Sequence, residues 1–563
     1  MSFNLITARW LPCRRADGNR IWIAPHEIAS EFDNPILTLD FPRPDWSAAV
    51  TELLIGLLSA TMPPTDSDAW ADAWITPPSP DTLRAAFAPL AFAFDLDGDG
   101  PRCFQDFALP SDAKPNGVGA LLIDAPGENT VKENKDLFVK RAGVEALSLP
   151  YAAAALITLQ TYAPLGGQGN RTSMRGGGPL TLLLAPRRRH GNHPAITTLW
   201  DLVWCNVRED DDDVGPLTAA LSRDNKRWPR VFPWLAETRA SKNDIATLSG
   251  QHADPLQAYF GMPRRIRLDV EPAGDVACSL GGPADDGIAK TYRSINYGIM
   301  YSGWRHPLSP YYVDAKNGLL PLHPQPGLTT YADWIAWWGL KDDTTAANVK
   351  LWRDRYAALA ANIGDLGETR QHVLHALGFN MDNMKARGWL DQRIPYFEPK
   401  TDAPVWAQQF QGAVTQMVAG AKAAANQLKY ELRRNLYAKW DGKQFKLLDN
   451  APKDAFDDVA AAFWSETEAD FVAALATLHD GDPADLDRKV RSEFLKILRL
   501  KARELFDAAS NMESLAEQNV RRLVEARKGL EYALADSGKV ASELGLVEQK
   551  PKGKGRAKGG ATT

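Results

Sequence analysis

A long apolar stripe after residue 400 constrains the fold of this chain more than any other feature of the sequence. Apolar residues recur there at steps of three or four, the period of a helix with one buried face: Trp406, Phe410, Val414, Met417, Ala421, Ala425, Leu428, Leu432 and Leu436. Thr401, Asp402 and Pro404 are typical of a helix start. A helix with such a long apolar face needs partner helices to cover it.

Three further stripes follow and can supply those partners. Their apolar residues are Phe456, Val459, Phe463, Phe471 and Leu475; then Val490, Phe494, Ile497, Leu498 and Leu505; then Met512, Ala516, Val520, Leu523 and Leu530. Four amphipathic helices with short connections predict an antiparallel four-helix bundle over residues 401–546. The Lys/Gly-rich remainder, residues 547–563, is predicted to be a disordered basic tail.

Residues 1–400 have a different texture, rich in proline, glycine and tryptophan. Short strand-like segments alternate with helical stretches. The strand-like segments are residues 21–24, 180–184, 265–270 and 299–301, and the helical stretches include residues 46–58 and 331–339. No βαβ periodicity indicates a doubly wound sheet. The predicted fold class is therefore α+β, with an irregular mixed α/β domain over residues 1–400 followed by the bundle, and 563 residues suit two or more domains.

The composition excludes some functions. A formal net charge of -5 argues against a protein that coats nucleic acid through bulk charge, although local basic patches remain possible. The four cysteines have no CxxC spacing, which favours free thiols in a reducing cytoplasm over a disulfide framework or a structural zinc site. No signal peptide is recognisable at the N-terminus, and no apolar run is long enough to span a membrane. We expect a cytoplasmic protein without membrane contact.

Signals of an active site are weak. Asp95, Asp97, Asp99 and Gly100 open like a calcium loop, but Pro101 follows the glycine and an Asp takes the place of the usual final Glu, which favours a tight Asp/Gly turn. His372 and His375 lie three apart in a helix-like stretch without an acidic or cysteine neighbour, which favours a structural role over a metal site. The sequence contains no phosphate-loop, GxSxG or metallohydrolase pattern. We expect no catalytic residues, no metal and no cofactor.

A glycine-rich segment stands out from this background. Pro164–Arg171 and Arg175–Pro179 contain six glycines, and a backbone without Cβ atoms can approach a partner closely. Arg171 and Arg175 add positive charge on either side. The alternative is a flexible connector, and the segment by itself leaves both interpretations open.

Basic clusters and one polar turn complete the candidates. Four basic clusters in an acidic chain suggest a binding track for a polyanion, although each cluster taken singly is typical of a solvated surface or a local ion pair. The clusters are Lys132, Lys135, Lys140 and Arg141; Arg187–Arg189; Lys226, Arg227 and Arg230; and Arg264, Arg265 and Arg267. The segment Gly378–Arg387 follows an expected helix end. It is interpreted either as a helix cap or as a protruding turn that inserts into a partner.

Taken together, these stretches resemble the CasA family, the large subunits of the type I-E CRISPR surveillance complex Cascade. Phe3–Ile6, Trp10–Pro12, Gly261–Leu268 and Trp304–Pro310 are similar to family motifs, and the glycine loop, the turn and the bundle follow in the family's order. The resemblance implies a non-catalytic subunit of a crRNA-guided complex. It would recognise the protospacer-adjacent motif (PAM) in double-stranded DNA, start target unwinding and help recruit the helicase–nuclease. The implied partners are this DNA, the crRNA, the other Cascade subunits and that nuclease.

The resemblance also implies site residues. Gly166, Gly167, Gln168, Gly169 and Asn170 are similar to the loop that meets the PAM duplex from the minor groove, where a degenerate pattern suits permissive readout by backbone. Asp382 and Asn383 fall at the wedge that enters the duplex beside the PAM. Family members often carry Gln or Asn there, so Asp382 is a departure; a carboxylate near phosphates is costly unless it is hydrogen-bonded, which favours Asn383 as the contact.

Three further assignments rest on the resemblance. Lys290 and Arg293 are the candidates for a lysine that touches PAM bases from a hairpin. Phe138, Lys140 and Arg141 resemble a loop that contacts neighbouring subunits and the crRNA 5′ handle. Some relatives bind zinc through clustered cysteines, but only Cys278 remains in that region, which implies no zinc. Two alternatives stay open: a scaffolding subunit that does not read DNA, and an enzyme with a metal at Asp95–Asp99.

Overall fold

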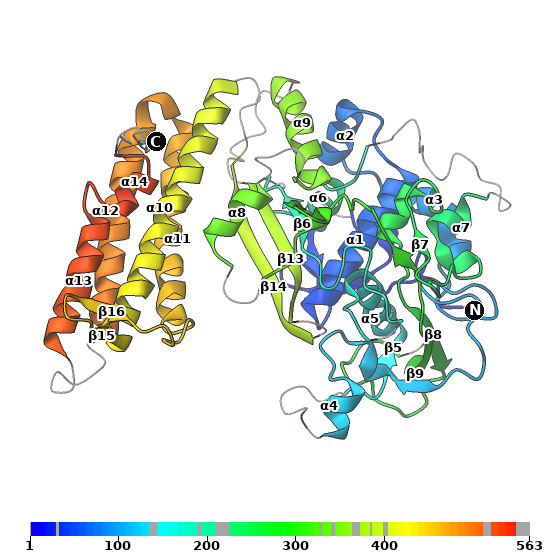
Figure 1. Ribbon diagram of the computed structural model, residues 1–563. Coiled ribbons are helices and arrows are strands. Elements are labelled where there is room, and N and C mark those ends of the chain that lie inside the picture. Colours follow the sequence, from blue (N-terminus) through cyan, green and yellow to red (C-terminus); the bar gives the residue numbers. More distant parts are fainter. Residues whose placement is uncertain are drawn as a thin grey trace, which may run out of the picture. The chain divides into compact units, whose positions relative to one another are not determined.

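The computed structural model describes most of the chain, and the account below is confined to those residues. They are 2–29, 33–133, 135, 143–167, 169–189, 194–209, 226–284, 286–325, 329–338, 344–362, 372–382, 385–397, 404–510 and 519–547. The chain divides into two compact units, an N-terminal unit of Met1–Gly327 with Ala336–Glu398, and a helical unit of Leu328–Ile335 with Pro399–Thr563. Each is described by itself (Figure 1).

The N-terminal unit mixes short strands with helices, which confirms the predicted α+β class. Its strands are β1 (Leu11–Arg15), β2 (Arg20–Ile23), β3 (Ile36–Leu39), β4 (Pro115–Gly117), β5 (Leu147–Ser148), β6 (Thr181–Ala185), β7 (Ala246–Thr247), β8 (Arg265–Glu271), β9 (Ile288–Ile295), β10 (Met300–Tyr301), β11 (Tyr311–Asp314), β12 (Gly318–Pro321), β13 (His372–Asp382) and β14 (Lys385–Tyr396). Its helices are α1 (Pro44–Thr61), α2 (Ser67–Ile75), α3 (Pro80–Phe87), α4 (Glu128–Lys132), α5 (Leu149–Tyr162), α6 (Leu199–Trp204), α7 (Trp228–Val231) and α9 (Ala347–Asn362).

Two buried elements hold the glycine-rich segment between them. Helix α5 is apolar on all sides and nearly every residue in it is buried, as expected for a helix in the middle of a core. Strand β6 is buried at all five positions. The segment from residue 163 to residue 180 joins the end of α5 to the start of β6. Its two ends are therefore fixed by the core, whatever its glycines allow in between.

A long β-hairpin packs beside β6. Strands β13 and β14 pair antiparallel from His372 opposite Tyr396 to Asp382 opposite Lys385, and β13 also pairs with β6, in the sheet order β14-β13-β6. The sequence expectation is wrong here, because His372 and His375 lie on a strand and Gly378–Asp382 continue that strand instead of following a helix end. The two residues that join the strands, 383 and 384, lie outside the described residues.

A second sheet supplies the other neighbour of the glycine-rich segment. Strand β9 pairs antiparallel with β8, β4 and β5. It ends at Ile295, and the chain then continues through residues 296–299 to β10. The segment after β9 contacts the glycine loop, as described below.

The helical unit contains the long helices that the apolar stripes predict. They are α10 (Pro404–Tyr437), α11 (Asp457–Asp480), α12 (Pro483–Ser510), α13 (Val520–Leu534) and the short α14 (Lys539–Glu543). A small hairpin of β15 (Ala438–Trp440) and β16 (Phe445–Leu447) joins α10 to α11. Met512 and Ala516 of the fourth stripe, and residues 548–563 of the predicted tail, lie outside the described residues.

The helical unit also includes a piece of chain that precedes residue 400. Helix α8 (Tyr331–Trp337) begins in this unit, where the Tyr331 ring stacks on Phe471 with ring centroids 4.2 Å apart. The Tyr331 hydroxyl and the Thr467 hydroxyl lie 2.9 Å apart. Tyr331 thus packs on α11, a contact that periodicity from residue 401 onward does not reveal.

Two simple expectations concern membranes and thiols. No helix in the described part of the chain is long and apolar enough to cross a membrane. All four cysteines are free thiols, with Cys13, Cys103 and Cys205 buried and Cys278 half-buried. The absence of disulfides agrees with the spacing of the cysteines in the sequence.

Candidate nucleic-acid interface

The glycine loop, residues 164–171, is held in a conformation that needs glycine. Gly167 and Gly169 have φ of 78° and 77°, in the left-handed region that other residues rarely adopt. The backbone N–H of Tyr297 donates to the Gly169 carbonyl over 2.7 Å. A Cβ at residue 169 would lie 2.8 Å from the Cβ of Asn296, so even alanine would force a shift. Gln168 lies outside the described residues.

The loop is also braced from within and from below. Asn170 donates its side-chain amide to the Gly166 carbonyl, which closes the loop on itself. Beneath it, the Arg264 guanidinium donates to the Pro164 carbonyl, and a Cβ at residue 166 would lie 3.2 Å from Arg264 Nη1. These contacts favour an ordered loop over the flexible connector that the sequence left open.

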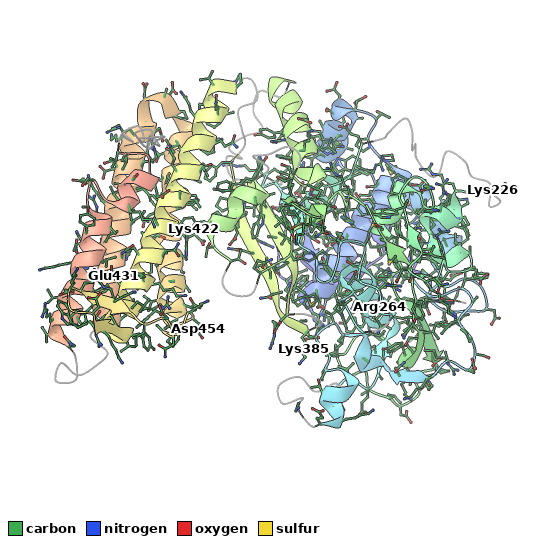
Figure 2. All side chains as sticks on the ribbon, in the orientation of Figure 1. Lys226, Arg264, Lys385, Lys422, Glu431 and Asp454 are labelled. Atoms are coloured by element: carbon green, nitrogen blue, oxygen red, sulfur yellow. The ribbon has the colours of Figure 1, made fainter. Side chains whose placement is uncertain are left out.

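Arg264 places a positive charge at the foot of the glycine loop. Its backbone is clamped by Gln160 of α5, with the Arg264 N–H donating to Oε1 and Nε2 donating to the Arg264 carbonyl, both over 2.9 Å. Burial lowers the pKa of Arg264 to about 10, so the guanidinium is still protonated at neutral pH. Figure 2 marks its position. The sequence grouped Arg264 with its basic neighbours, and nothing in the sequence ties it to the loop.

The two arginines that flank the glycines act inside the protein. Arg171 donates to the Ser241 hydroxyl over 2.7 Å and pairs with Asp244 at 2.7 Å, which ties the loop to residues 241–244. Arg175 is almost fully buried and pairs with Glu52 at 2.7 Å. The positive charge that the sequence places beside the glycines is therefore buried and balanced by Glu52 in the case of Arg175.

The second run of glycines joins the loop to the β13–β14 hairpin. A Cβ at residue 178 would lie 2.7 Å from the Phe379 carbonyl oxygen and 2.8 Å from Met381 Cγ, and Gly178 has φ of 63°. A Cβ at residue 177 would lie 3.3 Å from Pro164 Cα. The second glycine run therefore packs on the glycine loop through Gly177 and on the distal part of β13 through Gly178.

The end of the hairpin carries both signs of charge. Arg387 donates to the Asp382 carboxylate, and this hydrogen bond and charge, followed by the charge of Lys385, lower the pKa of Asp382. Asn380 pairs with Gly388 and Met381 pairs with Ala386, so Arg387 has no partner residue on β13. Arg387 is therefore the extra residue of a β-bulge. Lys385 is exposed at the hairpin's end (Figure 2). Asn383, the favoured wedge residue, lies outside the described residues.

Lys290 and Arg293 lie on β9 and are paired with acids of the neighbouring strand. Lys290 Nζ is 2.5 Å from Glu271, and Arg293 Nε is 3.1 Å from Asp269. The residues that contact the glycine loop come just after the strand, at Asn296 and Tyr297. Asn296 is exposed, and Tyr297 has the unusual φ of 65° for a large side chain. The sequence reasoning missed this pair.

The remaining candidates divide into two groups. Phe138, Lys140 and Arg141 lie outside the described residues. Several arginines of the basic clusters pair locally, as Arg188 does with Asp201 at 2.7 Å and Arg227 with Asp254 at 2.8 Å. Arg265 pairs with Asp106 in the same way. For these residues the local ion pair is the correct interpretation of the basic cluster.

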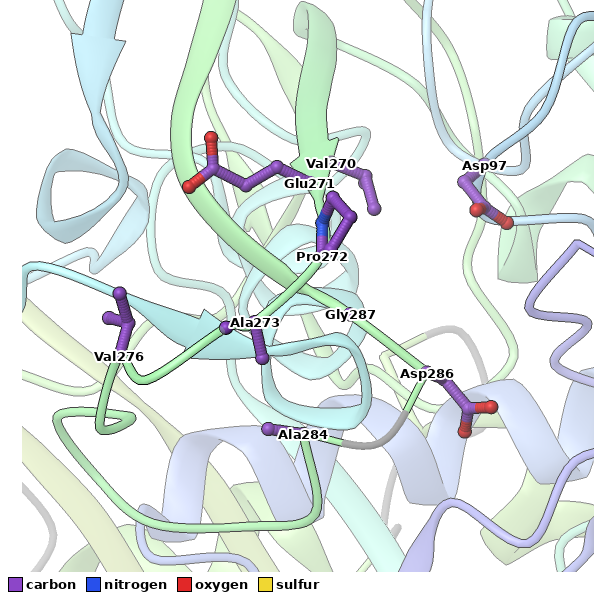
Figure 3. A pocket seen from close by; sticks show the side chains of 10 residues that line it. Asp97, Val270, Glu271, Pro272, Ala273, Val276, Ala284, Asp286 and Gly287 are labelled. Carbon is purple, nitrogen blue, oxygen red and sulfur yellow. The ribbon is translucent and has the colours of Figure 1, made fainter.

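The acidic turn serves the N-terminal segment. Asp95 accepts hydrogen bonds from the Ser2 hydroxyl over 2.7 Å and from the Asn4 amide over 2.8 Å, and Asp97 accepts from the Phe3 N–H over 2.6 Å. An open hollow near the turn is lined by Asp97, Glu271 and Asp286 (Figure 3). Within the described ranges no group of three or more His, Cys, Asp or Glu side chains is placed to hold a metal ion. The geometry favours the structural turn over a calcium loop.

Comparison with known proteins gives one family. The family model described as CRISPR-associated protein Cse1 matches residues 4–505. Among solved structures, Thermobifida fusca Cse1 is similar with a TM-score of 0.67 at 16% identity, covering 97% of this chain and 98% of that one. Thermus thermophilus CasA (Cse1) gives 0.65 at 17%, covering 94% and 99%. A chain of a CRISPR RNA-guided surveillance complex gives 0.62 at 15%, covering 95% and 99%. These likenesses show a shared fold over nearly the whole length.

Proposed function

The chain belongs to the CRISPR-associated protein Cse1 family, and from that membership we propose that it recognises the PAM in target DNA and starts its unwinding. It would do so as the large, non-catalytic subunit of a type I-E Cascade complex in the cytoplasm. The family is the one that the sequence motifs resemble. The observation that carries the proposal is that the glycine loop packs on Gly177 while the adjacent Gly178 packs on β13 of the β13–β14 hairpin.

The glycine loop suits contact with a minor groove. That groove is narrow and presents a degenerate pattern of acceptors, so a backbone loop without side chains can enter it and tolerate several sequences. Arg264 supplies a fixed positive charge at the foot of the loop, where DNA phosphates would lie. Asn296, packed against Gly169 and exposed, is our candidate for the polar side chain that accompanies the loop into the groove.

Lys290 and Arg293 become secondary candidates on this view. Their cationic groups pair with Glu271 and Asp269, so each would have to leave an ion pair before it contacted DNA. Such partly exposed pairs are weak, so the exchange is feasible but adds little net affinity. We therefore assign the main base contact to the segment after β9.

The hairpin suits the opening of base pairs beside the loop. Its strands pair up to Asp382 and Lys385, so a narrow, two-stranded element carries these two residues at the end of its described part. The ion pair with Arg387 balances the negative charge of the Asp382 carboxylate, which lowers the repulsion between this carboxylate and DNA phosphates. No nucleotide hydrolysis is needed, because the guide–target heteroduplex that forms is about as stable as the DNA duplex that it replaces.

The other partners follow from the family and not from the geometry. One similar chain belongs to a CRISPR RNA-guided surveillance complex, and we propose that this chain likewise assembles with crRNA and other Cascade subunits. The segment with Phe138, Lys140 and Arg141 is the proposed contact with crRNA and neighbouring subunits. Recruitment of a helicase–nuclease to the assembled surface completes the proposal.

Binding of PAM-bearing duplex by the assembled complex tests the proposal. Gly169→Val combines a forbidden φ with a clash against Asn296, and Asn383→Ala removes the wedge amide. Loss of good groove contacts is worth about 10- to 100-fold in affinity, and we expect each variant to lose that much for PAM-bearing DNA. Gly18→Val is the matched control, because Gly18 has φ of 86° in the β1–β2 turn with nothing within 4 Å of its Cβ position.

The scaffolding alternative makes the opposite forecast. If the two variants bind PAM-bearing duplex as the unaltered complex does, while the complex still discriminates against DNA without a PAM, another subunit reads the PAM. The chain would then serve only to hold the complex together.

A further inference from the structure

We propose that the buried Glu52–Arg175 ion pair couples the glycine loop to the β13–β14 hairpin and positions the hairpin for strand opening. The inference rests on the proposed function and adds to it two positioning residues that touch no DNA. Arg175 belongs to the glycine-rich segment, and Glu52 lies on α1 in the core.

The pair is the centre of a closed polar network. Both side chains are about 3% exposed, and Arg175 Nη2 donates to both Glu52 oxygens, over 2.7 and 3.1 Å. The Tyr162 hydroxyl and the Thr181 hydroxyl donate to Glu52 over 2.8 and 2.7 Å. Arg175 Nη1 donates to Thr181 over 3.0 Å and to Ser309 over 3.1 Å. Side chains from three further segments of the chain, at Tyr162, Thr181 and Ser309, therefore meet Arg175 and Glu52.

His306 adds no further charge to this network. It lies 3.7 Å from Glu52, but burial and then the charge of Arg175 lower the pKa of His306 far below the usual value. The imidazole is therefore neutral at physiological pH. Among the residues that the structure describes, Arg175 is the cationic side chain that balances the carboxylate of Glu52.

Aromatic contacts carry the network to the hairpin. The Arg175 guanidinium lies 5.7 Å from the ring centroid of Tyr162. That ring in turn makes edge-to-face contacts with Phe379 of β13 at 6.1 Å and with Trp389 of β14 at 5.5 Å. Phe379 and Trp389 also contact each other at 4.8 Å. Both strands of the hairpin thus rest on the side chain that holds Glu52.

Backbone contacts carry the network to the loop. Ser173, two residues before Arg175, donates its N–H to the Ala163 carbonyl over 3.0 Å and its hydroxyl to the Gly176 carbonyl over 2.6 Å. The turn that presents Arg175 is therefore attached to the residue where the glycine loop begins. A displacement of the loop would be transmitted to Arg175 and from there to Tyr162 and the hairpin.

The energetics favour positioning as the role of this pair. A buried ion pair is often no more stabilising than apolar residues of the same volume, because both charges lose their hydration. Its directional hydrogen bonds do fix geometry. In a core that is otherwise rich in apolar side chains, a charged network at the junction of loop and hairpin is therefore best explained by the alignment that it imposes.

The test compares two PAM-bearing targets in the assembled complex. One is an intact duplex, and the other has mismatches at the base pairs next to the PAM, so that it is already open. Opening is followed by the fluorescence of 2-aminopurine at the first of these positions. Side-chain changes in coupling networks alter coupling by roughly two- to thirtyfold. We expect Glu52→Gln to slow opening of the intact duplex about tenfold and to leave the pre-opened target within about twofold.

Two further variants guard against trivial loss of structure. Tyr162→Phe removes the hydroxyl contacts with Glu52 and Thr181, keeps the ring contacts with the hairpin, and should slow opening of the intact duplex by a smaller factor. Asp201→Asn removes a comparably buried carboxylate that pairs with Arg188 away from the loop, and should not change the ratio between the two targets. If Glu52→Gln does not fold, Tyr162→Phe decides the matter.

The outcomes separate this proposal from the proposed function. The coupling is overturned if Glu52→Gln and Tyr162→Phe slow opening of both targets equally. It is also overturned if Asp201→Asn changes the ratio between the two targets as much as Glu52→Gln does. Either result leaves PAM recognition intact. An unaltered complex that opens targets with and without a PAM equally overturns the proposed function itself.

Discussion

The two units of the molecule use charge in different ways. In the helical unit many ion pairs join neighbours on one helix, such as Arg491 with Asp487 and Lys501 with Glu504. In the N-terminal unit some buried pairs join residues that are far apart in the sequence, such as Arg175 with Glu52 and Arg265 with Asp106. The first kind adjusts the stability of a helix, whereas the second determines where a loop lies.

Glycine shows the same difference. Gly178 sits in a left-handed conformation against the backbone of β13, where no Cβ can be accommodated. Gly412 is an exposed residue within α10 with nothing within 4 Å of its Cβ position. Gly178 is thus required by tertiary contact, whereas Gly412 only weakens its helix. Other glycines of the helical unit are in tight contact as well, such as Gly420, where a Cβ would lie 2.4 Å from Leu544 Cγ.

The largest expected effect comes from making the same substitution in each unit. Gly178→Ala should destabilise the N-terminal unit by about 2–3 kcal/mol, because of the left-handed φ and the clash with Phe379. Gly412→Ala should stabilise the helical unit by about 0.5–1 kcal/mol through helix propensity. Hydrogen exchange of peptides from each unit measures the two effects separately. A loss of protection in the helical unit on Gly412→Ala would contradict the comparison.

A buried carboxylate in the helical unit gives the second prediction. Glu431 of α10 is almost fully buried; burial raises its pKa to about 7, against the opposing influence of Arg434 and the amide of Gln427. An unfolded Glu ionises near its usual value of 4.5, so between pH 4.5 and 7 only the folded state still binds the proton. The stability of the helical unit should therefore fall as pH rises through this window and stay level above it.

Glu431→Gln is the matched variant for that pH dependence. The amide keeps the shape of the side chain without the charge. Between pH 4 and 8, the free energy of unfolding of this variant should depend less on pH than that of the unaltered protein. At pH 8 it should be higher by about 1–2 kcal/mol. Stability that rises for the unaltered protein over the same window would show that Glu431 is ionised in the folded state.

The smallest expected effect concerns the hairpin's end. Asp382→Asn frees Arg387 from its ion pair and raises the local charge by one, so affinity for PAM-bearing DNA should increase about two- to threefold at low salt. The slope of log affinity against log salt should steepen by about one. Binding titrations at several salt concentrations measure both. An affinity decrease at every salt concentration would mean that the carboxylate itself contacts the DNA.

Local patterns predicted much of this fold, and their failures are informative. The stripes from Trp406 and Phe456 onward correspond to α10 and α11, because a helix face is defined by residues three and four apart. His372–Asp382 was misassigned because its apolar residues also fit a helical spacing. The strand is decided by pairing with Thr181–Ala185 and with β14, which are distant in the sequence.

The candidate site shows the same division. The glycines at 166–169 and the polar turn near 382 can be identified from residue type and order. Their contact through Gly178 cannot, because it depends on how α5, β6 and β13 pack. Asn296, Tyr297 and Arg264 were overlooked for that reason, since no spacing links them to residue 166. Arg175 was misjudged because an arginine in the sequence carries no sign of a buried partner such as Glu52.

By itself, the sequence determined the α+β class, the apolar faces of the bundle and the family, because these depend on periodicity and on the order of short motifs. Only the tertiary structure decided which charges are free and which are paired, and which loops form one surface. Ion pairs, hydrogen bonds and glycine contacts act over a few ångströms in space between residues that lie a hundred or more positions apart in the chain, as Glu52 and Arg175 do.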